Sequence, residues 1–425
     1  MNMDILPSEK EILFHIMDTM SADRRWRLTN PYPCSPGSSW PGIECKQGSD
    51  NYLHVSRLDF GTPPNPSCKK TAIFPSQIFS LPYLQSIFFF KCFTRTKTTL
   101  SIPPYIKPNS TLMTQLSLRS NPALVGPLPP QISTIRSLQV LTLSQNHLHG
   151  KIPEAISALT SLLHLDLSYN FLTGSIPPQV GSLRSLVDLD LSYNSLTGSI
   201  PPGIGDMGLL QKLDLSSNSL TGGIPSSLVK LRLLVFMALS NNRLTGTLPA
   251  GVGKLQNLQY LIMDDNPMFT TLPVEIGNLV RLQELRLANA GFSGSIPQGF
   301  SQLLNLTTLS LQNNRLTGGI PAGLSRLPHI YHLNLSRNLL GGIVPFDAGF
   351  FNRLGRNLDL SGNPGLCLNG SEGFVGMKIG IDVCVMNRTQ PISHQLKRSE
   401  ASFGGSNFCN LVGFLGVWLL YLRIL

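Results

Sequence analysis

Residues 165–177 read Leu-Asp-Leu-Ser-Tyr-Asn-Phe-Leu-Thr-Gly-Ser-Ile-Pro, and the same pattern of leucine, asparagine, glycine and proline returns at 189–201 and at 213–225. The spacing between copies is 24 residues. A fixed period of this size is typical of a solenoid, in which each unit stacks only on its two neighbours. We therefore expect an elongated array of repeats, in which no single unit folds alone.

The repeats can be followed along the chain by one asparagine in each unit. One unit breaks the series, because Ala290 stands at the asparagine position. Two degenerate units are predicted ahead of the series, where apolar residues alternate at 55–60 and 84–90. The array then holds about a dozen strands. The asparagines are Asn121, Asn146, Asn170, Asn194, Asn218, Asn242, Asn266, Asn314, Asn338 and Asn363.

The leucines of each unit have the spacing of a β-strand. Leu165 and Leu167 would point inward, while His164, Asp166 and Ser168 would point to the opposite face. We predict one short strand per repeat, paired in parallel with the next. The outer side is predicted to consist of loops and short helical turns, since glycines allow tight turns and prolines hold the return leg extended.

The repeated asparagine stands where the chain leaves the strand and turns. Its amide can hydrogen bond backbone groups of the turn that would otherwise be buried without partners. Ala290 cannot make these bonds. We predict a weak point or bend there, with faster hydrogen exchange than at the Asn266 and Asn314 turns.

These repeats resemble the plant-specific leucine-rich repeat of extracellular receptor kinases, receptor-like proteins and polygalacturonase-inhibiting proteins. More narrowly, residues 40–45, 65–68, 86–92 and 363–367 resemble the plant leucine-rich-repeat receptor-like proteins that lack a kinase domain, the class of TOO MANY MOUTHS and Receptor-Like Protein Twenty-Nine. The resemblance implies an α/β solenoid, a leucine-rich-repeat horseshoe with a parallel inner β-sheet and cysteine-bearing caps. It also implies a cell-surface receptor or co-receptor that binds peptides and partner receptor kinases.

This organisation divides the chain into four expected segments. They are an N-terminal cap at 1–50, repeats at 51–365, a C-terminal cap and stalk at 366–400, and an apolar tail at 401–425. Six of the seven cysteines are expected to form local pairs, in the two caps and in the degenerate first repeats. Six cysteines allow fifteen connectivities, so the pairing rests on proximity and on the resemblance; the alternative is buried free thiols. The expected pairs are Cys34–Cys45, Cys68–Cys92 and Cys367–Cys384.

Five Asn-x-Ser/Thr sequons fit a secreted glycoprotein, and the resemblance together with the apolar tail leads us to expect it at the outer face of the plasma membrane. The sequons begin at Asn109, Asn305, Asn334, Asn369 and Asn387. A glycan on Asn334, which is predicted to lie on the exposed face of the inner sheet, would exclude a partner. The chain opens without a signal peptide, so we expect a truncated gene model; a cytosolic protein is the alternative.

The C-terminal tail is almost wholly apolar from Phe408 to Leu422. Fifteen helical residues reach about 22 Å, which is short for a hydrocarbon core of about 30 Å. The tail is therefore either a marginal membrane span or a removable lipid-anchor signal, with Ser399, Ala401 and Ser402 as attachment candidates. In both cases we expect no cytoplasmic signalling domain, and Cys409 lies outside the disulfide set.

The sequence favours binding over catalysis, and we predict no enzyme, no cofactor and no metal site. The segment at 203–208 matches Gly-x-Gly-x-x-Gly, but it falls in the return loop of a repeat rather than after a strand that enters a helix. The histidine pairs His147/His149 and His329/His332 lack supporting ligands. The formal charge of +10 comes from scattered basic residues, which argues against nucleic acid and leaves acidic cell-wall polysaccharide as a partner.

A partner site is predicted where apolar residues replace polar ones on the exposed face of the inner sheet. Phe236 and Ala238 would lie beside Tyr260 and Ile262, one full repeat away. A charged rim would be formed by Asp264, Asp265, Glu284 and Arg286. The alternative is a locally filled groove.

Asp166, Asp190 and Asp214 recur as a column, which is either a solvated face or an acidic strip for a basic peptide. The predicted function is a co-receptor for a secreted peptide or protein, acting with a membrane receptor kinase. The alternatives are a cell-wall inhibitor of a microbial polysaccharide hydrolase and an adhesion scaffold.

Overall fold

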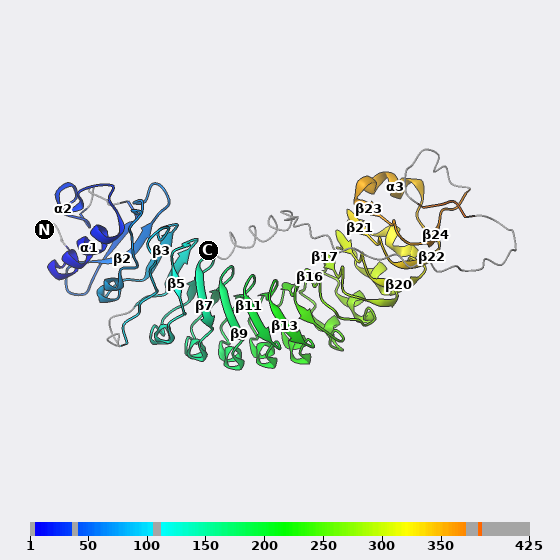
Figure 1. Cartoon of the computed structure of the whole chain (residues 1–425), viewed down its shortest axis with the longest axis horizontal. Coiled ribbons are helices and arrows are strands. Elements are labelled where there is room, and N and C mark those ends of the chain that lie inside the picture. The colour runs from blue at the N-terminus through cyan, green and yellow to red at the C-terminus, as the bar shows by residue number, and fades with distance from the viewer. Residues whose placement is uncertain (1–4, 36–40, 105–111, 371–380, 385–425) are drawn as a thin grey trace. The chain divides into compact units, whose positions relative to one another are not determined.

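The computed structural model describes residues 5–35, 41–104, 112–370 and 381–384, which belong to one compact unit. Figure 1 shows the repeats of this unit stacked side by side, each turn of the chain packing on the next. The predicted solenoid with a parallel inner sheet is confirmed.

The inner sheet contains fourteen strands, and every pairing is parallel except that of the first two. It includes the two degenerate units that were predicted from alternating residues. The strands are β1 (Ile43–Gln47), β2 (Leu53–Phe60), β3 (Ser86–Phe90), β4 (Gln115–Arg119), β6 (Val140–Thr142), β8 (His164–Asp166), β10 (Asp188–Asp190), β12 (Lys212–Asp214), β14 (Phe236–Ala238), β16 (Tyr260–Ile262), β17 (Glu284–Arg286), β19 (Thr308–Ser310), β21 (His332–Asn334) and β23 (Leu358–Asp359).

Most repeats contain a second strand, which the prediction of one strand per repeat missed. Residues such as Leu196-Thr197-Gly198, read from the sequence as a turn, pair with the same segment of the next repeat. These lateral strands are β5 (Val125–Gly126), β7 (His147–Lys151), β9 (Phe171–Ser175), β11 (Ser195–Gly198), β13 (Ser219–Gly222), β15 (Arg243–Leu244), β18 (Ser293–Ser295), β20 (Arg315–Gly318), β22 (Leu339–Ile343) and β24 (Gly365–Cys367).

The opposite side of each repeat carries a short 3-10 turn, as the sequence predicted for the outside. The turns are η1 (Ser76–Ser80), η2 (Pro130–Thr134), η3 (Glu154–Ala158), η4 (Pro178–Ser182), η5 (Pro202–Asp206), η6 (Ser226–Lys230), η7 (Val252–Lys254), η8 (Val274–Asn278), η9 (Gln298–Gln302), η10 (Ala322–Arg326) and η11 (Gly355–Asn357). All but η7 and η11 directly follow a proline, which fixes φ and needs no hydrogen-bond acceptor.

Helices occur at the two ends of the described unit. Helix α1 (Pro7–Met20) buries Leu13, Ile16 and Met17 completely and packs against the 3-10 turn η1. The other helices are α2 (Trp26–Thr29) and α3 (Ala348–Leu354). The ends of the leucine stack are thereby covered by apolar side chains.

Buried asparagines connect successive repeats in a ladder that is interrupted at Ala290. The amide nitrogen of Asn338 donates to the carbonyls of Leu311 (2.9 Å) and Leu335 (3.0 Å), and its oxygen accepts from the N–H of Leu316 (3.0 Å). Each amide therefore satisfies backbone groups of its own repeat and of the one before it. The predicted role of the asparagine is confirmed, and it extends across the repeat boundary.

The lateral strands divide into two sheets at the repeat that precedes Ala290. One runs from β5 to β15 and the other from β18 to β24. Since Ala290 offers no side-chain acceptor, the N–H of Met268 donates to the backbone carbonyls of Asn266 (2.8 Å) and Ala290 (3.1 Å). Pro267 also lacks an N–H for a ladder. The inner sheet continues through this repeat without interruption.

Candidate functional site

The exposed face of the inner sheet receives two side chains from each central strand. The middle residue is buried, as in Leu165, Leu189 and Leu213, and its two neighbours point away from the core. These neighbours form two rows across the sheet. The first row is His164, Asp188, Lys212, Phe236, Tyr260 and Glu284, and the second row is Asp166, Asp190, Asp214, Ala238, Ile262 and Arg286.

The predicted apolar cluster lies on this face but is smaller than expected. Phe236 and Tyr260 are direct neighbours, with ring centroids 5.9 Å apart, and both are half-buried, as is Ile262. Ala238 is only 4% exposed, so its predicted contact with solvent is wrong. Its short side chain stands between the larger side chains of Asp214 and Ile262. We call Phe236, Tyr260 and Ile262 the apolar patch.

The predicted charged rim is partly internal. Asp264 is 5% exposed, and it accepts hydrogen bonds from Arg286 Nε (2.8 Å) and from the N–H of Ala288 (2.7 Å). Its prediction as an exposed rim residue is therefore wrong, because it connects adjacent repeats. Asp265 is exposed, while Glu284 and Arg286 are half-buried and lie 3.7 Å apart. Burial raises the pKa of Asp264 and Glu284, and Arg286 opposes this shift.

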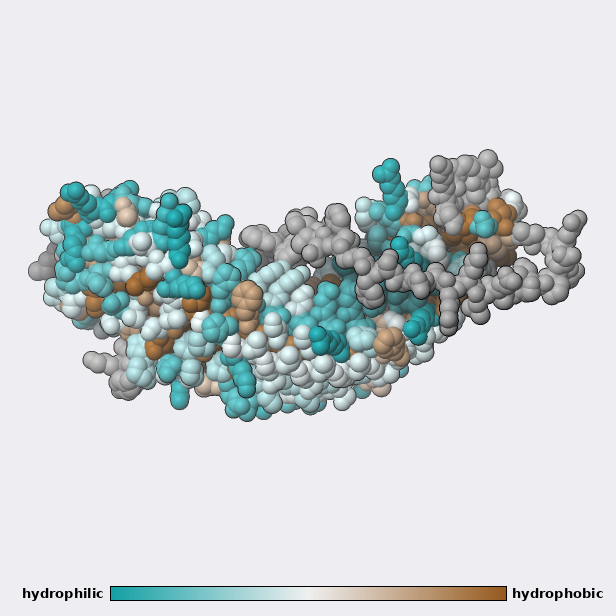
Figure 2. Space-filling view, in the orientation of Figure 1, coloured by the Kyte–Doolittle hydropathy of each residue, from teal (hydrophilic) through white to brown (hydrophobic). Residues whose placement is uncertain are grey.

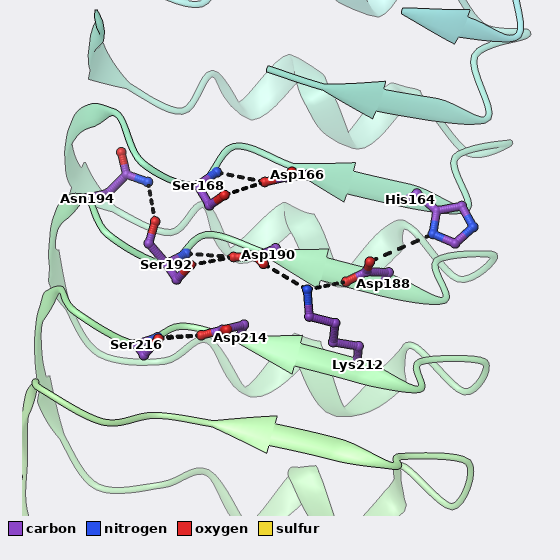
Figure 3. Close-up of polar contacts among 10 residues, drawn as sticks. All are labelled: His164, Asp166, Ser168, Asp188, Asp190, Ser192, Asn194, Lys212, Asp214 and Ser216. Atoms are coloured by element: carbon purple, nitrogen blue, oxygen red, sulfur yellow. Dashed lines mark hydrogen bonds and ion pairs between the residues drawn. The ribbon is translucent and has the colours of Figure 1, made fainter. Parts of the chain in front are cut away.

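Beside the apolar patch lies a column of three carboxylates, shown in Figure 3. Asp166, Asp190 and Asp214 are direct neighbours on strands β8, β10 and β12, and we call them the acidic strip. Each is held by the serine two residues later: Asp190 Oδ1 accepts from the N–H (3.1 Å) and the hydroxyl (2.7 Å) of Ser192. Ser168 makes the same bonds and is buried, contrary to its predicted exposure.

Lys212 faces the acidic strip from the first row. Its Nζ lies 2.8 Å from Asp190 Oδ2 and 3.6 Å from Asp188 Oδ1. Asp188 is 7% exposed, and its Oδ1 accepts no hydrogen bond within the described part of the chain. His164 Nδ1 lies 3.9 Å from the other oxygen of Asp188. Four carboxylates on three strands thus face one lysine and one histidine (Figure 3).

Crowding of these carboxylates changes their titration. Burial, followed by the charge of Asp190, raises the pKa of Asp166 to about 6 and that of Asp214 to about 7. Burial lowers the pKa of Lys212, but the charges of Asp188, Asp190 and Asp214 outweigh it and raise that pKa overall. Near neutral pH these carboxyls are therefore partly protonated, and a bound cation would favour their charged forms.

Two tyrosines extend the site beyond the ends of strands β8 and β10. The rings of Tyr169 and Tyr193 stack with centroids 4.1 Å apart and planes inclined by 9°. Burial raises the pKa of Tyr169, and the charges of Tyr193, Asp190 and Asp214 add to this shift. Tyr193 is 47% exposed. An aromatic surface and a carboxylate column therefore lie close together.

Sequence reasoning did not assemble this acidic and aromatic group. Asp188 and Lys212 are separated by one repeat, as are Tyr169 and Tyr193, so the projection that paired Phe236 with Tyr260 would have paired them too. The burial of Asp188 left no such signal, because it depends on the packing of its neighbours.

The disulfides are the three pairs that were expected: Cys34–Cys45, Cys68–Cys92 and Cys367–Cys384. Among the sequons, Asn305 is exposed, while Asn334 and Asn369 are half-buried. The amide oxygen of Asn334 accepts from Ser336 on the inner sheet. Asn109 and Asn387 lie outside the described residues, as do Cys409 and the rest of the apolar tail at 401–425.

Within the described ranges, no three His, Cys, Asp or Glu side chains are grouped so as to hold a metal ion. The segment at 203–208 largely forms the 3-10 turn η5 and the residues after it. None of the helices in the described part of the chain has the length and apolar character required to cross a bilayer.

Comparison with known proteins assigns the repeats. A family model described as Leucine rich repeat matches residues 136–196 and 280–340, and a second model with the same description matches 209–231. The chain is similar to Receptor like protein 29 of Arabidopsis thaliana, with 64% identity over 140 residues. That alignment covers 33% of this chain and 30% of the relative.

Solved structures with the same fold include a plant receptor kinase ectodomain in complex with a peptide hormone. The structure of PEPR1–AtPEP1 matches with a TM-score of 0.70 and 28% identity, covering 85% of this chain and 51% of that chain. The ectodomain of the Arabidopsis receptor kinase HAESA in complex with an IDA peptide hormone matches with a TM-score of 0.69 and 28% identity, covering 85% and 58%. The chain therefore spans about half the length of these two structures.

Proposed function

We propose that this chain, a leucine-rich-repeat protein of the plant receptor-like kind, binds a secreted peptide on the exposed face of its inner sheet and acts as co-receptor with a membrane receptor kinase. The observation that supports this most directly is the apolar patch, three half-buried apolar side chains in rows whose other members, apart from the buried Ala238, are polar or charged. Apolar side chains gathered on a solvent-facing surface mark interaction sites. The solved peptide complexes of similar receptors support a peptide as the ligand class.

The size of the face suits an extended ligand. Adjacent strands lie about 4.8 Å apart, so the fourteen strands of the sheet extend for roughly 60 Å. A folded partner or a long peptide can contact several repeats at once. Each repeat contributes two side chains, so a ligand is recognised by the order of residues along the two rows.

The proposal also assigns the location and the remaining segments. The three disulfides and the sequons fit an oxidising, glycosylating compartment. We place the repeats outside the plasma membrane, with residues 401–425 as the membrane tail or lipid-anchor signal, after the N-terminal cap, the repeats and the C-terminal cap. The receptor kinase would supply the intracellular signal.

Peptide selection tests the binding site. A phage-displayed library of random decapeptides is panned against the purified full chain and against its Phe236→Ala/Tyr260→Ala variant. Truncation of aromatic hot-spot residues typically costs about 2 kcal/mol or more, which is roughly thirtyfold in affinity. We expect the selected peptides to bind the variant at least that much more weakly, while Phe171→Ala, which truncates an exposed aromatic on the lateral strand β9, leaves their affinity unchanged.

The same variants test the co-receptor role. The tagged full chain is captured from plant membranes with and without a selected peptide, and co-purified receptor kinases are quantified. Kinase recovery should rise with the peptide and fall in the Phe236→Ala/Tyr260→Ala variant. Equal affinity of the native chain and the variant would refute the site, and kinase recovery that ignores both peptide and variant would refute the co-receptor role.

A further inference from the structure

The acidic strip and the apolar patch lie side by side on the same two rows of the inner sheet, and we call the two together the band. Along the second row the order is three aspartates, the buried Ala238, Ile262 and then Arg286. Arg286 is already paired with Asp264 at 2.8 Å. The uncompensated charge is therefore confined to the acidic end of the band.

We propose that this band is a single binding track for a peptide that carries a lysine or arginine three or four residues away from a bulky apolar side chain. The basic side chain would lie on the acidic strip, and the apolar side chain would lie on the apolar patch. This inference rests on the proposed function and names the chemistry of its ligand.

The first support is an incomplete balance of charge at a buried position. Lys212 Nζ is hydrogen-bonded to Asp190 Oδ2 (2.8 Å) but is 3.6 Å from Asp188 Oδ1. The Asp188 side chain is nine-tenths buried, and its Oδ1 accepts no hydrogen bond within the described residues. A buried carboxylate oxygen without a donor is costly. A second cation on the strip, beside Asp190 and Asp214, would supply positive charge to the group that one lysine leaves undercompensated.

The second support is the tyrosine pair at the end of the same strands. Tyr169 covers one face of the Tyr193 ring. On the other side of Tyr193, the corresponding residue of the next repeat is Ser217, whose side chain is too small to cover a ring. Lysine and arginine bind favourably over the face of a tyrosine. A basic side chain at this position has carboxylates and an aromatic face as neighbours.

The spacing of the ligand follows from the sheet. Asp214 is two strands from Ile262, and Asp190 is three strands away from it. At about 4.8 Å per strand these separations are roughly 10 and 14 Å. An extended peptide advances about 3.3 Å per residue, so its basic and apolar side chains are three or four residues apart.

One repeat of the chain has asparagine in place of the strip aspartate, which shows that an Asp→Asn substitution can remove the charge and keep the turn. Asn334 occupies the strip position on strand β21, and its Oδ1 accepts from the N–H (3.1 Å) and hydroxyl (2.7 Å) of Ser336. Asparagine thus makes the same turn as aspartate. The substitutions Asp166→Asn and Asp214→Asn keep this geometry and leave Asp190 paired with Lys212.

A matched control exists at the far end of the sheet. Asp359 on strand β23 accepts the same two bonds from Ser361, at 3.0 and 2.7 Å. It is six strands from Asp214 in the sheet order. Asp359→Asn therefore makes the same chemical change in the same turn, away from the track.

The experiment uses the decapeptides selected on the full chain, measured by calorimetry at pH 7.5. We expect most selected sequences to carry Lys or Arg three or four residues from Phe, Leu, Ile or Trp. The Asp166→Asn/Asp214→Asn variant should bind them at least tenfold more weakly, with a weaker dependence on salt. The Asp359→Asn variant should bind like the native chain, and replacing the basic residue by Gln should weaken binding to the native chain but not to the double variant.

The outcomes separate this inference from the proposed function. Peptides that require Phe236 and Tyr260 but show neither enrichment of basic residues nor sensitivity to the double variant overturn only the inference. Failure to select any peptide overturns both. Concentration-dependent self-association that the double variant abolishes would assign the strip to a second copy of the chain and also overturn the inference.

Discussion

Removing one asparagine of the ladder should lower the free energy of local opening of the solenoid, and the size of this decrease follows from the hydrogen bonds that are lost. Asn338 is 3% exposed and bonds one N–H, that of Leu316, and the carbonyls of Leu311 and Leu335. Asn338→Ala leaves these groups buried without that partner. An unsatisfied buried group costs about 1–3 kcal/mol. Counting the N–H fully and the carbonyls in part, because each has a second lone pair, gives roughly 3 kcal/mol.

Hydrogen exchange reads this local cost directly, because exchange of a protected amide follows the free energy of local opening. A cost of roughly 3 kcal/mol corresponds to about a hundredfold faster exchange. The acceleration should appear by mass spectrometry in the segments that contain Leu316 and residues 335–340, and not in distant repeats.

The control is Asn278→Ala, which removes an exposed asparagine outside the ladder and outside the sequons. This residue ends the 3-10 turn η8 on the outer side of its repeat, so we expect only a small change. If Asn338→Ala exchanged no faster than Asn278→Ala near Leu316, the ladder would not hold the repeats together as argued.

Three other predictions follow from the described contacts. Ala290→Asn should restore a side-chain acceptor for Met268, slow exchange at residues 266–271 and raise the free energy of unfolding by roughly 1 kcal/mol; unchanged exchange there would contradict this. Because the pKa of Asp214 is raised to about 7 by burial and by Asp190, the folded state binds more protons than the unfolded state between about pH 4 and 7. Stability should therefore fall as pH rises through this window, and Asp214→Asn should flatten the thermal midpoints measured between pH 4 and 7.5. Exposed Asn305 should carry a glycan in the secreted protein, so an unmodified mass of its tryptic peptide would contradict the assignment.

The fold was predictable from the sequence because the same local signals recur in one repeat after another. Leucine spacing, the ladder asparagine and the proline each recur in successive units, so the parallel inner sheet and the outer 3-10 turns followed from local chemistry. The lateral strands were missed because Leu-Thr-Gly forms a strand only when the neighbouring repeat supplies hydrogen bonds. A glycine with positive φ, such as Gly198, reads as a turn even though it belongs to strand β11.

The site was predicted less completely, for a related reason. Counting one full repeat correctly placed Phe236 beside Tyr260. It did not predict how much of each side chain its neighbours cover, and burial of Ala238 and Asp264 depends on that packing. The same limit hid Asp188, whose missing hydrogen bond becomes visible only once Lys212 is placed in three dimensions.

The division of the lateral strands near Ala290 marks the repeat at which we expect the solenoid to bend most easily. On one flank, the regular lateral ladders form two groups that are joined through this repeat only by single backbone bonds, such as Gly246 N–H to the Met268 carbonyl and Ser293 N–H to the Thr270 carbonyl, while the inner sheet runs on through it. Because this repeat has fewer lateral backbone bonds than its neighbours, we expect the solenoid to flex first here, about the intact inner sheet. Tyr260 and Ile262 lie on this repeat, so a small flexing there alters the groove in which a ligand's apolar side chain would rest.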